Sequence, residues 1–289
     1  MKSQVQKPAI FPFVLVIGAI SISFASIFIR LCGEVPSLVI ASFRTGVVSL
    51  FLLPFFLIKR ESYPSRLLLL SFLSGLGLAL HFGFWISSLK YTTIASSLFV
   101  LSVYPFLVAL GSHFILKERL TVTFTAGSLL TLAGIGLIFS LDLHSLRFTI
   151  GNLLSLLGAI SLVIYYIPGR IVRKKITIIP FLFVVYTSAT FFLLLLVITK
   201  GYSFTGYSPR SYLYLLLLAL VSQGLGHSSF NWALKYIKAG LVSITTLAEP
   251  IGASILAWII FKESLSAGKI AGAVLVVLGI IVAWRRERA

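Results

Sequence analysis

Two charged residues interrupt long apolar stretches of this sequence, and their surroundings make them the first candidates for binding chemistry. Arg44 and Glu249 each stand among apolar neighbours, and Pro250 follows the acid. A guanidinium in such a place can anchor a carboxylate or a phosphate, or it can join helices through carbonyl oxygens or an acidic partner. Glu249 can bind an ammonium group or a proton beside the backbone groups that Pro250 leaves unbonded, or it can be a neutral, hydrogen-bonded acid at a structural kink.

Further polar side chains recur at helical spacing. Gln223, His227 and Asn231 are four residues apart, which places them on one face of a helix. We expect this face to line a water-filled cavity, with a contact between helices as the alternative. His81 and Trp85 form a similar pair, in which Trp85 can stack on a substrate or pack in the core.

The motifs of several kinds of enzyme are missing from the sequence. It contains no nucleotide-binding loop, no HExxH or GxSxG motif and no paired carboxylates. The single cysteine, Cys32, excludes an intrachain disulfide, and no Cys or His pattern typical of a metal site occurs. The four histidines lie in different segments without an acidic partner nearby in the sequence. We therefore predict neither an enzyme nor a bound cofactor or metal.

The elements that position these residues are long apolar helices. Of the 289 residues, 58% are hydrophobic and 11% are charged, and the mean hydropathy is +1.07. The apolar runs reach the roughly 20 residues that a helix needs to cross a bilayer. The sequence thus predicts an all-α integral membrane protein of about ten spans. We expect them at residues 11–30, 36–58, 67–89, 94–116, 123–140, 150–168, 180–199, 212–234, 240–261 and 268–285.

The basic residues predict how the chain is oriented. The net charge is +17, but Lys and Arg lie in short breaks between apolar runs rather than on one arm or face, so we do not expect nucleic acid as a partner. With the N-terminus inside, inner segments hold 16 of them, outer segments hold 7, and Arg44 lies within a span. The positive-inside rule therefore predicts cytoplasmic termini and contact with anionic lipid headgroups.

The chain also repeats itself at a constant offset of 145 residues. The matched segments are 89–91 with 234–236 (LKY), 117–118 with 262–263 (KE), 126–127 with 271–272 (AG), Pro105 with Pro250, Leu120 with Leu265 and Gly134 with Gly279. At this offset Tyr104 takes the place of Glu249, so its hydroxyl is a further candidate for the cavity. We predict two repeats, residues 1–142 and 143–289. Five spans in each make the repeats inverted in the membrane, the arrangement that many secondary transporters use for alternating access.

Several motifs resemble those of a known family. They are residues 23–30 (SFASIFIR), 41–44 (ASFR), 104–105 (YP), 117–118 (KE), 247–250 (LAEP) and 261–263 (FKE), with Lys262 where glycine is usual. With these the chain resembles the ten-helix EamA-type members of the drug/metabolite transporter superfamily. The resemblance implies a central cavity lined by the first four helices of each half, with the fifth packed behind, and cargo such as amino acids or other metabolites.

Together these patterns predict a secondary transporter or exporter of a small polar metabolite, an amino acid or a related compound, across the inner membrane. The predicted substrate-binding residues are Arg44, His81, Trp85, Tyr104, Gln223, His227, Asn231 and Glu249. Protons are a candidate coupling ion, with Glu249 first and His227 second among the groups that could carry them. The alternatives are a membrane scaffold that transports nothing and an intramembrane enzyme.

Overall fold

The computed structural model describes residues 7–59, 61–92, 94–139, 149–262 and 266–285, and all regular elements within these ranges are helices. The predicted boundary between residues 142 and 143 lies outside them, as does Glu263. The helices of the first half are α1 (Phe11–Ser23), α2 (Ala25–Leu31), α3 (Ser37–Lys59), α4 (Ser65–Ser88), α5 (Ile94–Leu101), α6 (Tyr104–Leu116) and α7 (Val122–Phe139).

The second half contains a π-helical segment, η1, in addition to its α-helices. Its elements are α8 (Ile150–Arg173), α9 (Ile178–Thr199), α10 (Pro209–Leu217), η1 (Leu218–His227), α11 (Ser228–Ala233), α12 (Ala239–Thr246), α13 (Glu249–Phe261) and α14 (Ala267–Trp284). In the described residues ten helices or runs of joined helices are long and apolar enough to cross a membrane, which confirms the predicted number.

The spans agree closely with the predicted ones, and the largest difference is at the end of the sixth. We placed that end at Pro168, but α8 continues through the proline to Arg173. Proline is tolerated inside membrane helices because neighbouring groups satisfy the freed backbone. The extra turn matters for function, since it carries the two buried arginines Arg170 and Arg173.

The internal repeat is visible in the helix boundaries. Adding 145 to the limits of α5, α6 and α7 gives the limits of α12, α13 and α14 without a shift of one residue. Both α6 and α13 end at a lysine in the left-handed conformation, Lys117 with φ 57° and Lys262 with φ 58°. Matched sequence segments therefore adopt matched conformations, including an uncommon one.

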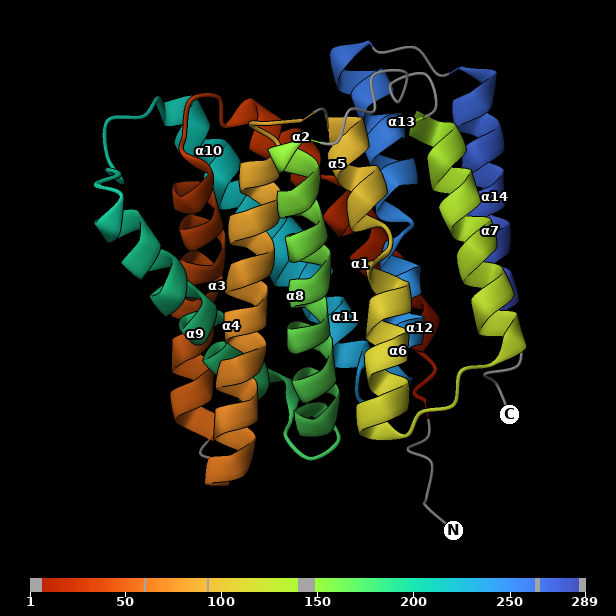
Figure 1. Ribbon diagram of the computed structural model, residues 1–289. Coiled ribbons are helices and arrows are strands. Elements are labelled where there is room, and N and C mark those ends of the chain that lie inside the picture. The colour runs from red at the N-terminus through yellow and green to blue at the C-terminus, as the bar shows by residue number, and fades with distance from the viewer. Residues whose placement is uncertain (1–6, 60, 93, 140–148, 263–265, 286–289) are drawn as a thin grey trace.

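The fifth span of each half, α7 and α14, packs against its counterpart at one edge of the molecule, where the two helices run in opposite directions (Figure 1). A Cβ atom built on Gly134 would lie 2.6 Å from the Gly272 carbonyl oxygen, and one on Gly127 would lie 2.4 Å from that of Gly279. The backbones are thus in direct contact, as small residues permit in membrane helices. This pair stands behind the helices that line the centre.

Gly134→Ala is expected to destabilise the protein by about 1–3 kcal/mol, because the new methyl group has to push two backbones apart. Gly136 on the same helix is the matched control, since a Cβ there meets its nearest neighbour, Phe99, at an ordinary 3.4 Å. The thermal unfolding midpoint of the purified protein in detergent measures both variants. Equal midpoints for Gly134→Ala and Gly136→Ala would contradict the close contact.

The two halves interlock around the centre. α4 packs along α8 and α9, and α3 packs along α9, so the middle helices of the first half are held by the first two spans of the second. α1 in turn contacts η1 and α13. Helices of each half therefore pack directly against helices of the other, as α4 does against α8 (Figure 1).

Candidate functional site

A cavity lies where the two halves meet, and residues from both halves line it. Its lining side chains are Ile22, Ala25, Arg44, His81, Phe82, Trp85, Leu101, Tyr104, Leu162, Tyr166, His227, Phe230, Thr246 and Glu249. Six of the eight predicted substrate-binding residues are thus brought together. The volume open to the centres of water molecules is about 40 Å³, room for about three waters.

Two of the lining residues begin the second part of a broken helix. Ser102 and Val103 separate α5 from α6, and Leu247 and Ala248 separate α12 from α13, so Tyr104 and Glu249 each start a new helix near the middle of a span. Proline follows each of them in the first turn, where its missing N–H costs nothing. The local opening predicted at Pro250 is present as this break, and discontinuous helices at such depth typically bind substrates in transporters.

Arg44 is fully buried and has polar atoms without partners. Its Nε donates a hydrogen bond to Gln223 Oε1 at 3.0 Å, and its guanidinium carbon lies 4.0 Å from the centre of the Phe82 ring. The two terminal nitrogens, Nη1 and Nη2, have no hydrogen-bond partner among the described residues. The contacts to α4 and η1 hold the guanidinium in place while two of its charged donors stay available.

Glu249 shares the cavity with Arg44, but the two do not form an ion pair. The ion pair found in the described residues joins Arg170 to Glu118 instead. The carboxyl group lies at the N-terminal end of α13, where the helix dipole favours a negative charge. The cavity therefore contains one fixed cation and one acid that do not neutralise each other directly.

Several aromatic rings also line the cavity. His81 and Trp85 are stacked, with ring centres 5.8 Å apart and planes within 3°. His81 Nδ1 lies 3.2 Å from the Gly158 carbonyl oxygen, and because a carbonyl only accepts, this nitrogen carries the proton in the neutral ring. Trp85 Nε1 is buried and has no hydrogen-bond partner in the part of the chain that the structure describes, and Trp85 lines the same cavity as Arg44. His227 meets Phe82 edge to face at 5.4 Å.

The hydroxyl of Tyr104 is already occupied. It donates to the Ser243 carbonyl oxygen at 2.9 Å and also bonds Thr246 Oγ1, so it links α6 to α12 across the halves. Its ring stacks on that of Tyr166 with centres 6.4 Å apart. Tyr104 thus lines the cavity with its ring, and we assign its hydroxyl a bridging contact.

Gln223 and Asn231 do not line the cavity, although His227 between them does. Gln223 lies behind Arg44, and Asn231 donates to the Tyr165 hydroxyl and to the His227 carbonyl oxygen. Gln223 and His227 lie in the π-helical segment η1, and Asn231 lies in α11. The three residues therefore do not lie on one regular α-helix, which the predicted shared face assumed.

Some lining residues were not among the predicted ones. Phe82, Tyr166 and Thr246 belong to the wall, and Phe82 carries the cation–π contact with Arg44. The tyrosine pair at 165–166 inside an apolar span is a signal that the sequence offers. Phe82 carries no such signal, since one phenylalanine among 24 is indistinguishable from a core residue.

Comparison with known proteins gives a consistent result. The family model described as the EamA-like transporter family matches residues 10–140 and again residues 149–285. A protein of Archaeoglobus fulgidus described as an uncharacterized transporter is 25% identical over 276 residues, which cover 94% of this chain and 95% of that protein. The uncharacterized transporter YoaV of Bacillus subtilis is 25% identical over 258 residues, 86% of this chain and 87% of its own. A crystal structure with a TM-score of 0.81 and 18% sequence identity covers 98% of this chain and 99% of its own, and it supports the fold.

Proposed function

Because the chain belongs to the EamA-like transporter family and is a multi-pass membrane transporter, we propose that it is a secondary exporter of a small polar metabolite across the inner membrane. The cargo of this proposal is an amino acid or a related compound, and the mechanism is alternating access through the cavity between two repeats divided near residues 142 and 143. The proposed substrate-binding residues are those that line the cavity with polar groups, Arg44, His81, Trp85, His227 and Glu249.

The observation that carries the proposal is the pair of unpartnered nitrogens on Arg44. A buried guanidinium that had a purely structural role would have its donors bonded to carbonyls or to an acid. Here Nε is bonded and Nη1 and Nη2 are not. The two free nitrogens form the fork that binds a carboxylate through two parallel hydrogen bonds, and Trp85 Nε1 adds a neutral donor to the same wall.

Glu249 supports an amino acid rather than a simple anion. It lines the same cavity as Arg44 and can accept hydrogen bonds from an ammonium group. A zwitterion then neutralises both buried charges at once, its carboxylate at Arg44 and its ammonium at Glu249. An anion alone would leave Glu249 unpaired in an apolar wall, which is costly.

The size of the cavity supports a mechanism with moving helices. A volume of about 40 Å³ for water centres is far below the several hundred Å³ of ordinary ligand pockets. An amino acid therefore needs the lining helices of the two halves to separate. That movement is what alternating access requires, with the cavity opening to one side of the membrane at a time.

The alternative of a non-transporting scaffold is less well supported. It requires a closed core in which Arg44 and Glu249 satisfy each other. In the described residues they face a common cavity without an ion pair. No observation at the site supports an intramembrane enzyme, and the family of the chain indicates transport.

Counterflow in proteoliposomes tests the proposal. Vesicles loaded with a single unlabelled amino acid are diluted into the same compound carrying a radiolabel, over a panel that includes amino acids, their amides and their decarboxylated amines. We expect labelled uptake for one group of zwitterions and none for the matched amines. A folded preparation that moves no compound of a broad panel would contradict it.

We further propose that both termini are cytoplasmic, as the distribution of Lys and Arg predicts. With Cys32 replaced by alanine, Lys175→Cys between α8 and α9 should react with an impermeant thiol reagent only in inside-out vesicles. Thr205→Cys between α9 and α10 is the matched position on the other side, and both residues are exposed. Labelling of Lys175→Cys in intact cells would reverse the orientation.

A further inference from the structure

The turn between α11 and α12, residues 234–239, is held by charged residues of other helices. These contacts lie at the end of the molecule where α8 ends, the side proposed to be cytoplasmic, and outside the substrate cavity. We call residues 234–239 the docking turn. It contains the segment LKY at 234–236, which repeats residues 89–91 and has no part in the cavity.

One end of the docking turn is held by two arginines of α8. Arg170 Nη1 donates to the Leu234 carbonyl oxygen, and Arg173 Nε donates to the Asn231 carbonyl oxygen at 3.1 Å. Both carbonyls belong to the last turn of α11, where carbonyl groups lack partners within the helix and the dipole is negative. Both arginines are buried, so their charges rely on these contacts.

The other end of the docking turn is held by an acid. Glu118 Oε2 accepts a hydrogen bond from the Ala239 backbone N–H at 3.3 Å, the first residue of α12, where the dipole is positive. Glu118 Oε1 accepts from Arg170 Nε at 3.1 Å. The ion pair thus contacts both ends of the turn, with the base at a helix C-terminus and the acid at a helix N-terminus.

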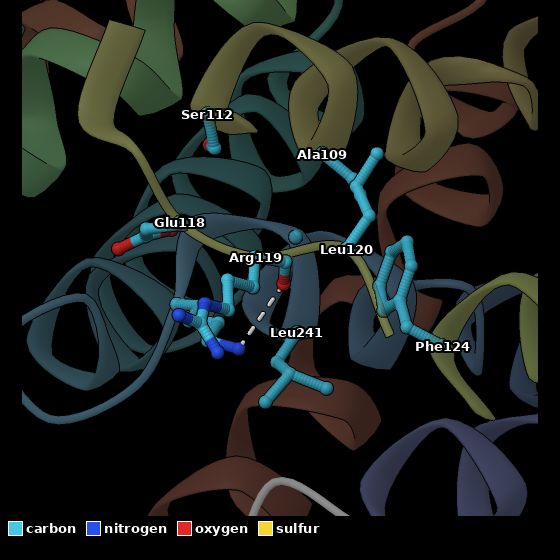
Figure 2. A pocket seen from close by; sticks show the side chains of 9 residues that line it. Ala109, Ser112, Glu118, Arg119, Leu120, Phe124 and Leu241 are labelled. Carbon is cyan, nitrogen blue, oxygen red and sulfur yellow. Dashed lines mark hydrogen bonds between the residues drawn. The ribbon is translucent and has the colours of Figure 1, made fainter. Parts of the chain in front are cut away.

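A third contact closes the exposed side of this junction. Lys238 Nζ donates to the Arg119 carbonyl oxygen at 3.2 Å, and the segment from Glu118 to Leu120 lies against Leu241 of α12 (Figure 2). The pocket left between them has about 20 Å³ of space for water centres, enough for about one water. The segments therefore pack closely at this junction.

The helices that meet at the junction also reach the cavity. α6, α8, α11 together with η1, and α12 each contribute a lining residue to the cavity, namely Tyr104, Tyr166, His227 and Thr246. The same elements converge at the docking turn further along. The main contacts across the junction join side chains on one side to backbone atoms of the turn. When these contacts break, Glu118 and Arg170 keep each other, and Arg173 keeps its hydrogen bond to the Ile176 carbonyl oxygen.

We propose that the docking turn and the Glu118–Arg170 pair form the gate that closes the cavity on this side. Opening moves the turn away from a preformed ion pair, and water then satisfies the released ends of α11 and α12. This inference rests on the proposed alternating access, but it assigns residues outside the substrate site.

Access from the gated side tests the inference without measuring transport. Ala25 lines the cavity, and Ala25→Cys in a Cys32→Ala background serves as a reporter for a charged, impermeant thiol reagent added to inside-out vesicles. Glu118→Ala should raise the labelling rate about tenfold or more, since a charge-assisted contact of the closed state is lost. Lys238→Ala removes the contact to the Arg119 carbonyl oxygen on the exposed side and should raise the rate by less.

Glu61→Gln is the matched control. Glu61 also accepts a backbone hydrogen bond from the second half, from Thr177 N at 3.1 Å, but not from the docking turn. Labelling should stay at the level of the parent. An unchanged rate in folded Glu118→Ala and Lys238→Ala, or an equal rise in Glu61→Gln, would overturn the gate. Unchanged labelling with intact counterflow refutes the gate alone, whereas faster labelling without counterflow of any compound refutes the cargo and leaves the gate standing.

Discussion

Arg44→Gln is expected to lower the exchange of carboxylate-bearing substrates by at least about a hundredfold, because two charge-assisted hydrogen bonds of roughly 1.5–3 kcal/mol each are lost. The two bonds are those that Nη1 and Nη2 are free to make. The measurement is the initial rate of counterflow in proteoliposomes at a substrate concentration well below saturation. The glutamine amide can still donate to Gln223, which limits damage to the fold.

Arg44→Lys is the matched variant for this prediction. It keeps the positive charge but offers a point donor in place of the planar fork, so its rate should fall between those of the parent and Arg44→Gln. The thermal unfolding midpoint of each variant in detergent separates a binding defect from misfolding. If Arg44→Gln is stable and exchanges the substrate at the parent rate, Arg44 has a structural role and the proposed carboxylate anchor is wrong.

Glu249→Gln is expected to abolish uphill, proton-driven transport while exchange continues. The amide has the shape of the acid and can still accept a hydrogen bond from an ammonium group, but it cannot bind and release a proton. The measurement compares accumulation of labelled substrate under an imposed pH gradient with counterflow without one. Accumulation should fall to the level of vesicles without protein, and counterflow should persist with weaker affinity.

The control for Glu249→Gln is an acid that lies away from the cavity. Glu34 is exposed, follows the end of α2, and does not line the cavity. Glu34→Gln removes the same charge from the chain and should leave accumulation unchanged. Uphill transport that survives in Glu249→Gln would exclude Glu249 as the coupling group and would make His227, which faces the same cavity, the next candidate.

The spans and the repeat were predictable because they depend on properties that the sequence expresses locally. Apolar runs of sufficient length define the helices, and matched Pro, Gly, Lys and Glu positions gave the offset at which α5 to α7 and α12 to α14 coincide. Our predicted end of α8 was wrong. Proline usually ends helices in soluble proteins, but it is tolerated inside the helices of a membrane bundle. That missed turn carries Arg170 and Arg173, so their contacts in the proposed gate could not be predicted from the sequence.

The candidate site was predictable where a residue is unusual for its surroundings. Arg44, Glu249, His81 and His227 stand out in apolar spans, and all four line the cavity. The positions of Gln223 and Asn231 were not predictable in detail. The prediction of a shared face assumes one regular α-helix, whereas η1 is a π-helix. Which side chains share a wall depends on how α3, α4 and η1 cross, and the spacing of residues along one helix does not contain that information.

The α7–α14 contact is symmetric under exchange of the two halves. Gly127 corresponds to Gly272 and Gly134 to Gly279 at the repeat offset. Exchange of the two halves therefore converts the contact of Gly134 with Gly272 into the contact of Gly127 with Gly279. This is the isologous interface of a twofold dimer, contained in a single polypeptide. A true dimer would place the same residue at both equivalent positions of its cavity, two tyrosines or two glutamates. The covalent link between the halves allows Tyr104 and Glu249 to differ, so this pair of equivalent positions holds one carboxyl group where a true dimer would hold two or none.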